Sequence, residues 1–274
     1  MCWGISNQSR SEQNSPPSTF YLSLFTFYFP PFLSVNPLHP PFSLPVNHGR
    51  VKAVGSFEEL VSTPFADGVN ALCWQRTLDG DFAEVVERLG VGDGITTVDA
   101  ARLQALSLSD EGQKARAILL QDLELLHAHD LLPVLDCIDG YTRDTDGGPV
   151  PTDVYSFHAD SATVPADTYL CTYHGRSSEG LRNEEAIRKV DVPETRAELL
   201  RLYGGEDDAD FIEHLNDHFF DLHYAALPDA RPYSFGIGNL WRIAIAYPGC
   251  PVPPCIHRAP ETLPGDPTRL LLIS

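Results

Sequence analysis

Two histidines and one aspartate have the types and the spacing to bind one metal ion. His158 and Asp160 lie two residues apart at the end of a strand-like segment, 154–159, and His257 follows about a hundred residues later. Residues two apart in a strand point to the same face, so the His158 imidazole and the Asp160 carboxylate can reach one ion together. Such ligands suit Fe(II) and similar borderline ions. A His-x-Asp pair alone is no rarer than chance in a chain with ten histidines, so the prediction depends on His257.

An arginine completes the pattern. Arg269 follows His257 by twelve residues and opens the last strand-like segment, 269–273. A His-x-Asp pair, a distal His and an Arg about a dozen residues beyond resemble the order in the Fe(II)/2-oxoglutarate oxygenase superfamily, as does the string His257-Arg258-Ala259-Pro260. The resemblance implies an α+β chain with a double-stranded β-helix (cupin-like jelly roll) core, flanking N-terminal helices and a helical insert. It also implies that His158, Asp160 and His257 are the metal-binding and catalytic triad.

The same resemblance implies residues that hold the co-substrate. Arg269 is expected to pair with the far carboxylate of 2-oxoglutarate through two parallel hydrogen bonds, a geometry that Lys does not reproduce. Arg258 competes for this role, and pairing of Arg269 with one of the many carboxylates is the alternative. Tyr169 and Tyr173 share one strand face and are expected to contact 2-oxoglutarate or to pack in the core. The reaction would use O₂ to hydroxylate or otherwise oxidise a small-molecule or protein substrate.

A fainter resemblance covers residues 55–274. It is to an uncharacterised family of conserved proteins known only as a domain of unknown function, and it names no substrate. The strings that carry it are Phe157–Asp160, Leu170–Gly175, Ser178–Leu181 and His257-Arg258.

Two further classes of function stay open. The chain is either a metal-binding cupin-like protein with chemistry that does not use 2-oxoglutarate, or a non-catalytic module in which His158 and Asp160 are a hydrogen-bonded pair. A second cluster, on a predicted helix, can bind zinc but is more typical of a solvated acidic surface; it contains His214, Asp217, His218, Asp221 and His223. Trp241 and Arg242 precede His257 on a strand and face either the pocket or the core. Motifs of the common nucleotide loops and of the Gly-x-Ser-x-Gly and His-Glu-x-x-His enzymes are absent.

The composition indicates a soluble protein with a sizeable core. The chain has 274 residues, 43% of them hydrophobic, and a formal charge of −19. Such an acidic chain repels phosphate backbones, so nucleic acid is not expected as a partner. The six cysteines form no Cys-x-x-Cys pair and are predicted to be reduced and buried. The oligomeric state stays open.

The chain divides at about residue 46. Residues 1–46 are rich in Ser, Asn, Pro and aromatic residues and are predicted to be disordered or non-native, with 47–274 as one domain. The apolar run 20–29 is too short to span a membrane, which needs about 20 residues. Without a basic start or a cleavage site, a targeting peptide is not favoured, and we expect a cytoplasmic protein.

The elements that must position the triad follow from periodicity. Helices come first, then strands, and a polar helical insert interrupts the strands. The insert and the Gly- and Asp-rich loop 139–153 are expected to shape the entrance to the site. The predicted helices are 56–60, 81–89, 97–106, 110–129, 194–203 and 210–223, and the predicted strands are 71–75, 131–138, 154–159, 168–174, 241–247 and 269–273.

Overall fold

The computed structural model describes residues 42–44, 48–145 and 148–274. It separates two units, Met1–Pro40 and Pro41–Ser274. The predicted disordered segment 1–46 lies outside the described residues except for 42–44. Phe42 and Leu44 pack against buried core residues, and the Phe42 ring meets Trp241 edge-on with centroids 6.3 Å apart. The packed part of the chain therefore begins before residue 47, where we predicted the domain to start.

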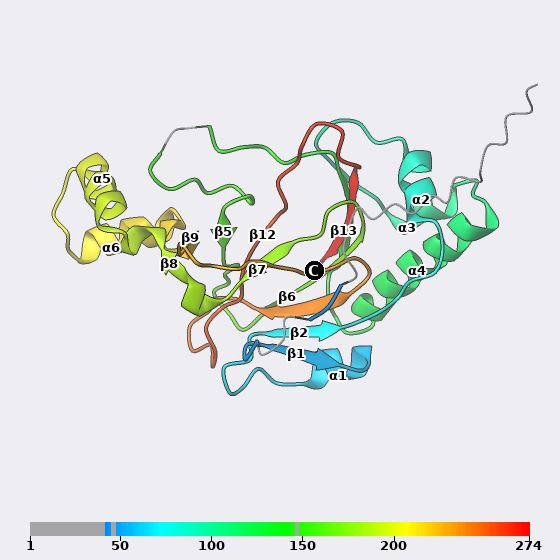
Figure 1. Ribbon diagram of the computed structural model, residues 1–274, viewed down its shortest axis with the longest axis horizontal. Coiled ribbons are helices and arrows are strands. Elements are labelled where there is room, and N and C mark those ends of the chain that lie inside the picture. Colours follow the sequence, from blue (N-terminus) through cyan, green and yellow to red (C-terminus); the bar gives the residue numbers. More distant parts are fainter. Residues whose placement is uncertain (1–41, 45–47, 146–147) are drawn as a thin grey trace, which may run out of the picture. The chain divides into compact units, whose positions relative to one another are not determined.

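Two β-sheets form the framework of the unit Pro41–Ser274 (Figure 1). One has seven strands in the order β1-β2-β11-β6-β13-β4-β3, and the other has six in the order β10-β7-β12-β5-β9-β8. Neighbours pair antiparallel, except that β1 and β2 are parallel. The α+β prediction is confirmed as a mixed chain with two sheets rich in antiparallel pairs. The seven-stranded sheet contains β1 (Val51–Val54), β2 (Ala71–Trp74), β3 (Ile95–Thr97), β4 (Val134–Ile138), β6 (Asp167–His174), β11 (Leu240–Ala244) and β13 (Arg269–Ile273). The six-stranded sheet contains β5 (Phe157–His158), β7 (Glu179–Leu181), β8 (Ala186–Arg188), β9 (His223–Ala226), β10 (Tyr233–Ser234) and β12 (Ile256–Arg258).

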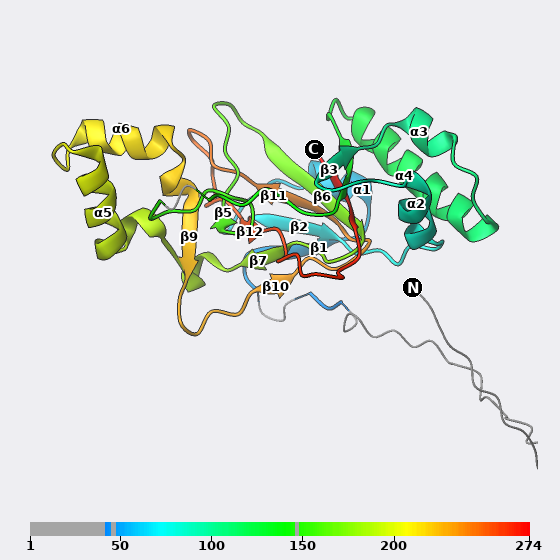
Figure 2. The same ribbon diagram turned by 90° about the horizontal axis from the view of Figure 1, so that it is seen from above.

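Most of the helices lie at the two ends of this unit, and α1 lies beside β1 and β2 (Figure 1). Helices α2, α3 and α4 gather at one end, and α5 and α6 of the insert lie at the other (Figures 1 and 2). The α-helices are α1 (Phe57–Ser62), α2 (Phe82–Leu89), α3 (Ala100–Gln104), α4 (Asp110–His127), α5 (Pro193–Tyr203) and α6 (Ala209–Asp217). The 3₁₀ helices are η1 (Asn183–Glu185), η2 (Lys189–Asp191) and η3 (Phe220–Leu222). None of the described helices has the length and apolar composition needed to cross a membrane.

Helix α1 begins at the capping box that the sequence predicts. The Ser56 hydroxyl accepts a hydrogen bond from the Glu59 amide, and the Glu59 carboxylate accepts one from the Gly55 amide, so two free amides at the helix start are satisfied. The predicted helix 97–106 is shorter in the structure. Thr97 instead ends strand β3, paired with Asp136, and Asp99 caps the short α3 that follows.

The insert differs from its prediction in a way that matters for the site. The helix predicted over 210–223 ends at Asp217 because Phe219 adopts a left-handed backbone conformation, with φ 57°, that a right-handed helix does not continue. A 3₁₀ turn follows, and His223 then begins strand β9 rather than ending a helix. His223 is therefore buried in a sheet and does not belong to a solvated helix surface.

Strand β6 lies in the middle of the seven-stranded sheet and is buried on both faces. One face carries Tyr169, Cys171 and Tyr173 into a core shared with the helices, which we call the helix-side core. The other face carries Leu170 into a second core with Phe235, Trp241 and Cys255, which we call the inner core. Because side chains alternate along a strand, Thr168 and Thr172 belong to the inner face. The cysteines in the described residues are free thiols, as predicted, and all but the half-buried Cys250 are buried: Cys73, Cys137, Cys171, Cys250 and Cys255.

Candidate metal centre

The three residues predicted to bind a metal ion lie together. His257 on β12 is paired directly opposite His158 on β5, and their ring centroids are 4.6 Å apart. Asp160 follows β5, and its carboxylate oxygens lie 3.8 Å from Nε2 of His158 and 3.8 Å from Nε2 of His257. One ligand atom from each residue lies within 4.8 Å of the others. The cluster can therefore hold one metal ion.

Backbone carbonyls orient both imidazoles for this purpose. Nδ1 of His158 lies 2.8 Å from the Ser156 carbonyl, and Nδ1 of His257 lies 3.4 Å from the Cys255 carbonyl. A carbonyl only accepts a hydrogen bond, so each Nδ1 carries the proton and each Nε2 keeps its lone pair free. Both free lone pairs are on the atoms that face Asp160. A hydrogen bond from the second ring nitrogen is the usual support of a metal-binding histidine.

The charges of the three side chains suit a divalent cation. Burial, with help from the neighbouring His257, lowers the pKa of His158 to about 4, so this imidazole is neutral at physiological pH. Burial opposes ionisation of Asp160, but His257, the Thr168 hydroxyl and His158 together outweigh it and lower its pKa. The Thr168 hydroxyl donates to Asp160 over 2.6 Å. The site thus offers a carboxylate and neutral imidazole nitrogen, the forms that bind metal.

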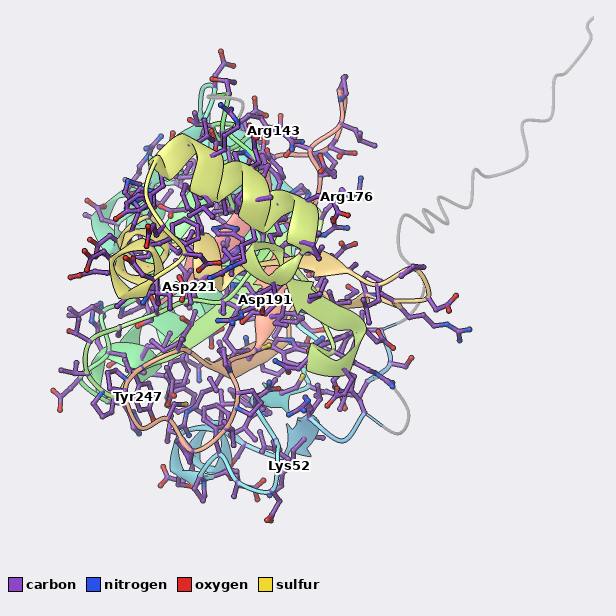
Figure 3. All side chains as sticks on the ribbon, turned by 90° about the vertical axis from the view of Figure 1, so that its left-hand side faces the viewer. Lys52, Arg143, Arg176, Asp191, Asp221 and Tyr247 are labelled. Carbon is purple, nitrogen blue, oxygen red and sulfur yellow. The ribbon has the colours of Figure 1, made fainter. Side chains whose placement is uncertain are left out.

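A pocket of about 310 Å³ opens beside the triad. His158 and Asp160 line one side of it, so the cluster has an open side as well as a buried one. The other walls come from the loop before β5 and from the insert, as the sequence led us to expect; they contain Thr152, Val154, His218, Phe219, Leu222 and His223. Figure 3 views the molecule from the side of the insert and shows the labelled Asp191 and Asp221 on that part of the chain.

His223 is the residue of this site that sequence reasoning missed. It is paired opposite His158 on β5, and the ring centroids of the two are 5.8 Å apart. Burial, His158 and Lys189 lower the pKa of His223 to about 4. The predicted helix through residue 223 concealed it, because that prediction assigned His223 to a solvated helix surface. The apolar residues that follow His223 are the one sequence signal for the strand.

Arg269 is a buried cation without a carboxylate partner among the described residues. It is 5% exposed, and its guanidinium donates to three hydroxyl groups, those of Tyr141 (2.9 Å), Thr172 (3.2 Å) and Ser178 (2.6 Å). Its Nε is buried without a hydrogen-bond partner. Burial lowers the pKa of Arg269, and the nearby Tyr141 only partly opposes this. A buried charge is normally paired, so this arginine lacks an anion.

Strand β6 connects Arg269 with the triad. Thr168 bonds to Asp160 and Thr172 bonds to Arg269, and both belong to the inner face of β6. These two threonines are four residues apart, which a strand spans in about 13 Å. The metal cluster and Arg269 therefore both contact the inner face of β6, Asp160 through Thr168 and Arg269 through Thr172.

Three other residues predicted to bind the co-substrate lie elsewhere. Tyr169 and Tyr173 are on the opposite face of β6, in the helix-side core, and the Tyr173 hydroxyl donates to Asp122. Arg258 pairs with Glu179 and stacks over the Phe157 ring at 4.4 Å. Of the two roles expected for Tyr169 and Tyr173, the structure therefore has packing in the core, and Arg258, the competitor of Arg269 for the co-substrate, is paired with a carboxylate instead. The reason is that side chains alternate between the two faces of a strand. Tyr169, Tyr173 and Arg258 each come directly after a residue that faces the site, so they point the other way.

The two faces of β11, the strand that contains Trp241 and Arg242, also point to different cores. Trp241 lies in the inner core, stacked on Phe235 with centroids 4.4 Å apart. Arg242 faces the helix side, where it bonds to Asp167 and to carbonyl oxygens of α1.

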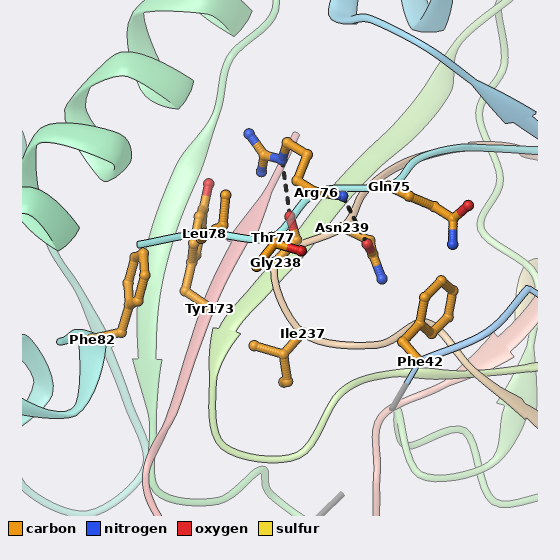
Figure 4. Close-up of a pocket in the computed structure, with 10 residues that line it drawn as sticks. All are labelled: Phe42, Gln75, Arg76, Thr77, Leu78, Phe82, Tyr173, Ile237, Gly238 and Asn239. Carbon is orange, nitrogen blue, oxygen red and sulfur yellow. Dashed lines mark hydrogen bonds between the residues drawn. The ribbon is translucent and has the colours of Figure 1, made fainter. Parts of the chain in front are cut away.

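A further pocket of about 500 Å³ contains Arg76 but offers no free cation (Figure 4). The Arg76 guanidinium forms two parallel hydrogen bonds, of 2.7 and 2.8 Å, with the buried carboxylate of Asp122. Figure 4 also shows it bonded to the Gly238 carbonyl. This arginine is therefore committed to the fold, in contrast to Arg269.

The chain matches no protein-family model. Comparison with curated proteins and with solved structures likewise gives no match.

Proposed function

We propose that the protein is an Fe(II)- and 2-oxoglutarate-dependent oxygenase built on a jelly-roll core. One observation carries the proposal: a His-Asp-His cluster and a buried arginine without an anion both bond to threonines on the inner face of β6. Two antiparallel-rich sheets, with His158 and His257 on the six-stranded one and Arg269 on the other, support this proposal, because a jelly roll is also built from two antiparallel sheets.

In this proposal His158, Asp160 and His257 hold the ion through one atom each. Three protein ligands on one side leave open positions for a bidentate co-substrate and for O₂. Asp160 supplies the charge, and Thr168 holds its carboxylate in place. The backbone carbonyls of Ser156 and Cys255 hold the imidazoles with Nε2 toward the ion.

Arg269 supplies the charge that anchors the co-substrate. Its planar guanidinium pairs with the far carboxylate of 2-oxoglutarate, and the hydroxyl groups of Tyr141 and Ser178 fix the position of the guanidinium. When bound, Fe(II) and 2-oxoglutarate together supply the activation of O₂ that oxidises an unreactive C–H bond. The protein excludes water through the inner core, and the pocket of about 310 Å³ admits the substrate from the side of the insert.

Succinate formation tests the proposal. Protein purified without oxygen is loaded with Fe(II) and 2-oxoglutarate, and succinate is measured with and without O₂. We expect slow O₂-dependent succinate formation even without the substrate, and its loss in Asp160→Ala. Succinate formation that continues unchanged in Asp160→Ala, or that does not need O₂, would contradict the proposal.

One observation favours a second candidate, a metal-dependent enzyme that does not use 2-oxoglutarate. The pocket that reaches Arg269, also lined by Tyr141 and Thr262, measures about 20 Å³, room for about one water molecule. A five-carbon diacid there requires side chains to move. Calorimetry separates the two candidates: binding of Mn(II) followed by 2-oxoglutarate supports the first, and binding of Mn(II) alone supports the second.

A further inference from the structure

Three histidines form a row across the six-stranded sheet. His257 on β12 is paired with His158 on β5, and His158 is paired in turn with His223 on β9. Directly opposed residues of an antiparallel pair point to the same face, so all three imidazoles lie on one face. The ring centroids are 4.6 Å apart for the first pair and 5.8 Å apart for the second. The row therefore extends the metal cluster by one residue toward the insert.

His223 differs from the other two histidines in its hydrogen bonds. Its side chain is buried, at 5% exposed, and its Nδ1 has no hydrogen-bond partner. Within the described residues, no carbonyl oxygen holds its ring as Ser156 holds that of His158. A buried polar group without a partner destabilises the fold, so such groups usually meet a ligand or an ordered water. Nδ1 itself is covered by the fold, whereas Nε2 is not among the covered atoms and forms no hydrogen bond with the described residues. Nε2 is therefore the ring nitrogen that a ligand can reach.

The pocket beside the triad is where a ligand can reach His223. His223 lines it together with His158 and Asp160, so it faces the open side of the cluster. It is not a fourth ligand here, because the group of atoms within 4.8 Å of one another contains only His158, Asp160 and His257. Its ring lies one strand farther out, with its centroid 5.8 Å from that of His158. Phe219, 57% exposed and in a left-handed conformation, forms the wall next to it.

We propose that His223 is a positioning residue that hydrogen-bonds a small ligand at the open side of the ion. This inference rests on the proposed function, because it requires an ion at His158, Asp160 and His257. It goes further by assigning a role to a residue outside the triad. Thr168 fixes the Asp160 carboxylate from the inner side of the site. His223 would fix the small ligand from the pocket side.

Nitric oxide is the probe for the test, because it binds Fe(II) at an open position and gives a characteristic paramagnetic signal. The full chain is loaded with Fe(II) without oxygen, and nitric oxide dissociation is followed by stopped-flow absorbance. We expect His223→Ala to speed dissociation about tenfold, which corresponds to a hydrogen bond of about 1.4 kcal/mol. The electron paramagnetic resonance signal should change shape, and the Kd for Fe(II) should stay within about twofold of wild type.

Two variants complete the design. His223→Gln keeps an N–H donor and should recover part of the slow dissociation, and it serves if the alanine variant folds poorly. His218→Ala is the matched control, because His218 lines the same pocket but its Nδ1 is already bonded to the His214 carbonyl over 2.8 Å. It should leave dissociation unchanged.

Each contrary result has a distinct meaning. Equal dissociation rates in wild type and in both His223 variants overturn the inference and leave the proposed function intact. Loss of Fe(II) binding in His223→Ala also overturns it, since His223 would then be a ligand. An equal effect of His218→Ala overturns it by showing that any change to the pocket wall is sufficient. A wild-type chain that binds no Fe(II) overturns both this inference and the proposed function.

Discussion

Replacing Arg269 by methionine should have little effect on the stability of the ligand-free protein. Burial of a guanidinium charge costs several kcal/mol even after the protein relaxes. In Arg269 this is offset by hydrogen bonds to three hydroxyl groups, each worth about 1.5–3 kcal/mol because the donor is charged. The two contributions are similar in size, and methionine removes both while filling much of the volume. We therefore expect the free energy of unfolding to change by less than about 2 kcal/mol.

Arg76→Met is the matched control. Arg76 is also buried, but it pairs with the Asp122 carboxylate, and the side chains of the two are 9% and 3% exposed. Removing this arginine leaves a buried carboxylate with the Tyr173 hydroxyl as its remaining donor. The loss of one partner from a buried ion pair costs about 3–5 kcal/mol. Urea unfolding of the metal-free proteins should place Arg76→Met well below both wild type and Arg269→Met.

The ligand-bound protein should show the opposite pattern. With Mn(II) present and 2-oxoglutarate at about 100 times its Kd, binding stabilises the wild-type fold by about 2.7 kcal/mol. For a domain of this size, that raises Tm by about 5–10 °C. Arg269→Met should lose nearly all of this increase. If Arg269→Met is as unstable as Arg76→Met, Arg269 is a structural cation and the reasoning fails. If it keeps the full increase in Tm, the co-substrate is anchored elsewhere.

Three further predictions concern other contacts of the fold and the site. Thr168→Val removes the hydrogen bond to Asp160 and should weaken Mn(II) binding by about 10- to 100-fold in calorimetry, with unchanged circular dichroism. Phe219→Gly should stabilise the metal-free protein by about 1 kcal/mol in urea unfolding, because glycine adopts the left-handed conformation freely; an equal loss in stability would show that the exposed ring packs more than its position indicates. Burial and Arg182 lower the pKa of His48 to about 4, so between pH 6.5 and 4 the unfolded chain binds the extra proton and stability falls as the pH falls. His48→Gln should remove up to about 3 kcal/mol of that loss between pH 7 and 4, measured by urea unfolding of metal-free protein, and identical pH profiles would contradict the assignment.

Local periodicity was sufficient to predict part of the site. The two-residue repeat of a strand places His158 and Asp160 together, and that holds although β5 is only Phe157–His158. The pairing of His257 with His158 is a long-range register between strands of two and three residues. The strand propensities of such short segments do not specify which strand pairs with which. The expectation that His257 joins His158 therefore came from the order of the ligand residues along the chain.

Which face of β6 points to the site could not be predicted from the sequence either. The spacing of Tyr169 and Tyr173 correctly places them on one face, but the direction of that face depends on what lies on each side. Both faces of β6 are buried, so the strand lacks the alternation of polar and apolar residues that marks an inner face. The hydroxyl groups of Thr168 and Thr172 identify the face of β6 that points to the site, because they bond to Asp160 and Arg269. These contacts are known only from the structure.

The prediction of the insert was wrong because of a single residue, Phe219. Helical spacing continues through Asp217, and Phe219 ends it in a conformation that few residues other than glycine adopt. A sequence contains no signal for such a stop, and the error moved His223 from a sheet to a surface. Non-glycine residues in this conformation often occur where function fixes the backbone, which fits the place of Phe219 in the pocket wall.

Among the described residues, four side chains have a buried polar atom without a hydrogen-bond partner: His48, Asp221, His223 and Arg269. Of these, His223 lines the pocket beside the triad, and Arg269 bonds to the strand that also bonds to Asp160. The charge of Arg269 lacks an anion in the inner core, and neither ring nitrogen of His223 has a hydrogen-bond partner among the described residues. Local inconsistencies of this kind tend to occur where a ligand completes the arrangement, because a fold otherwise satisfies such groups itself. Arg269 requires an anion, and His223 requires a small hydrogen-bonding group. In the proposed function, an ion held by His158, Asp160 and His257 would bind a dianionic co-substrate that pairs with Arg269 and a small ligand that bonds to His223.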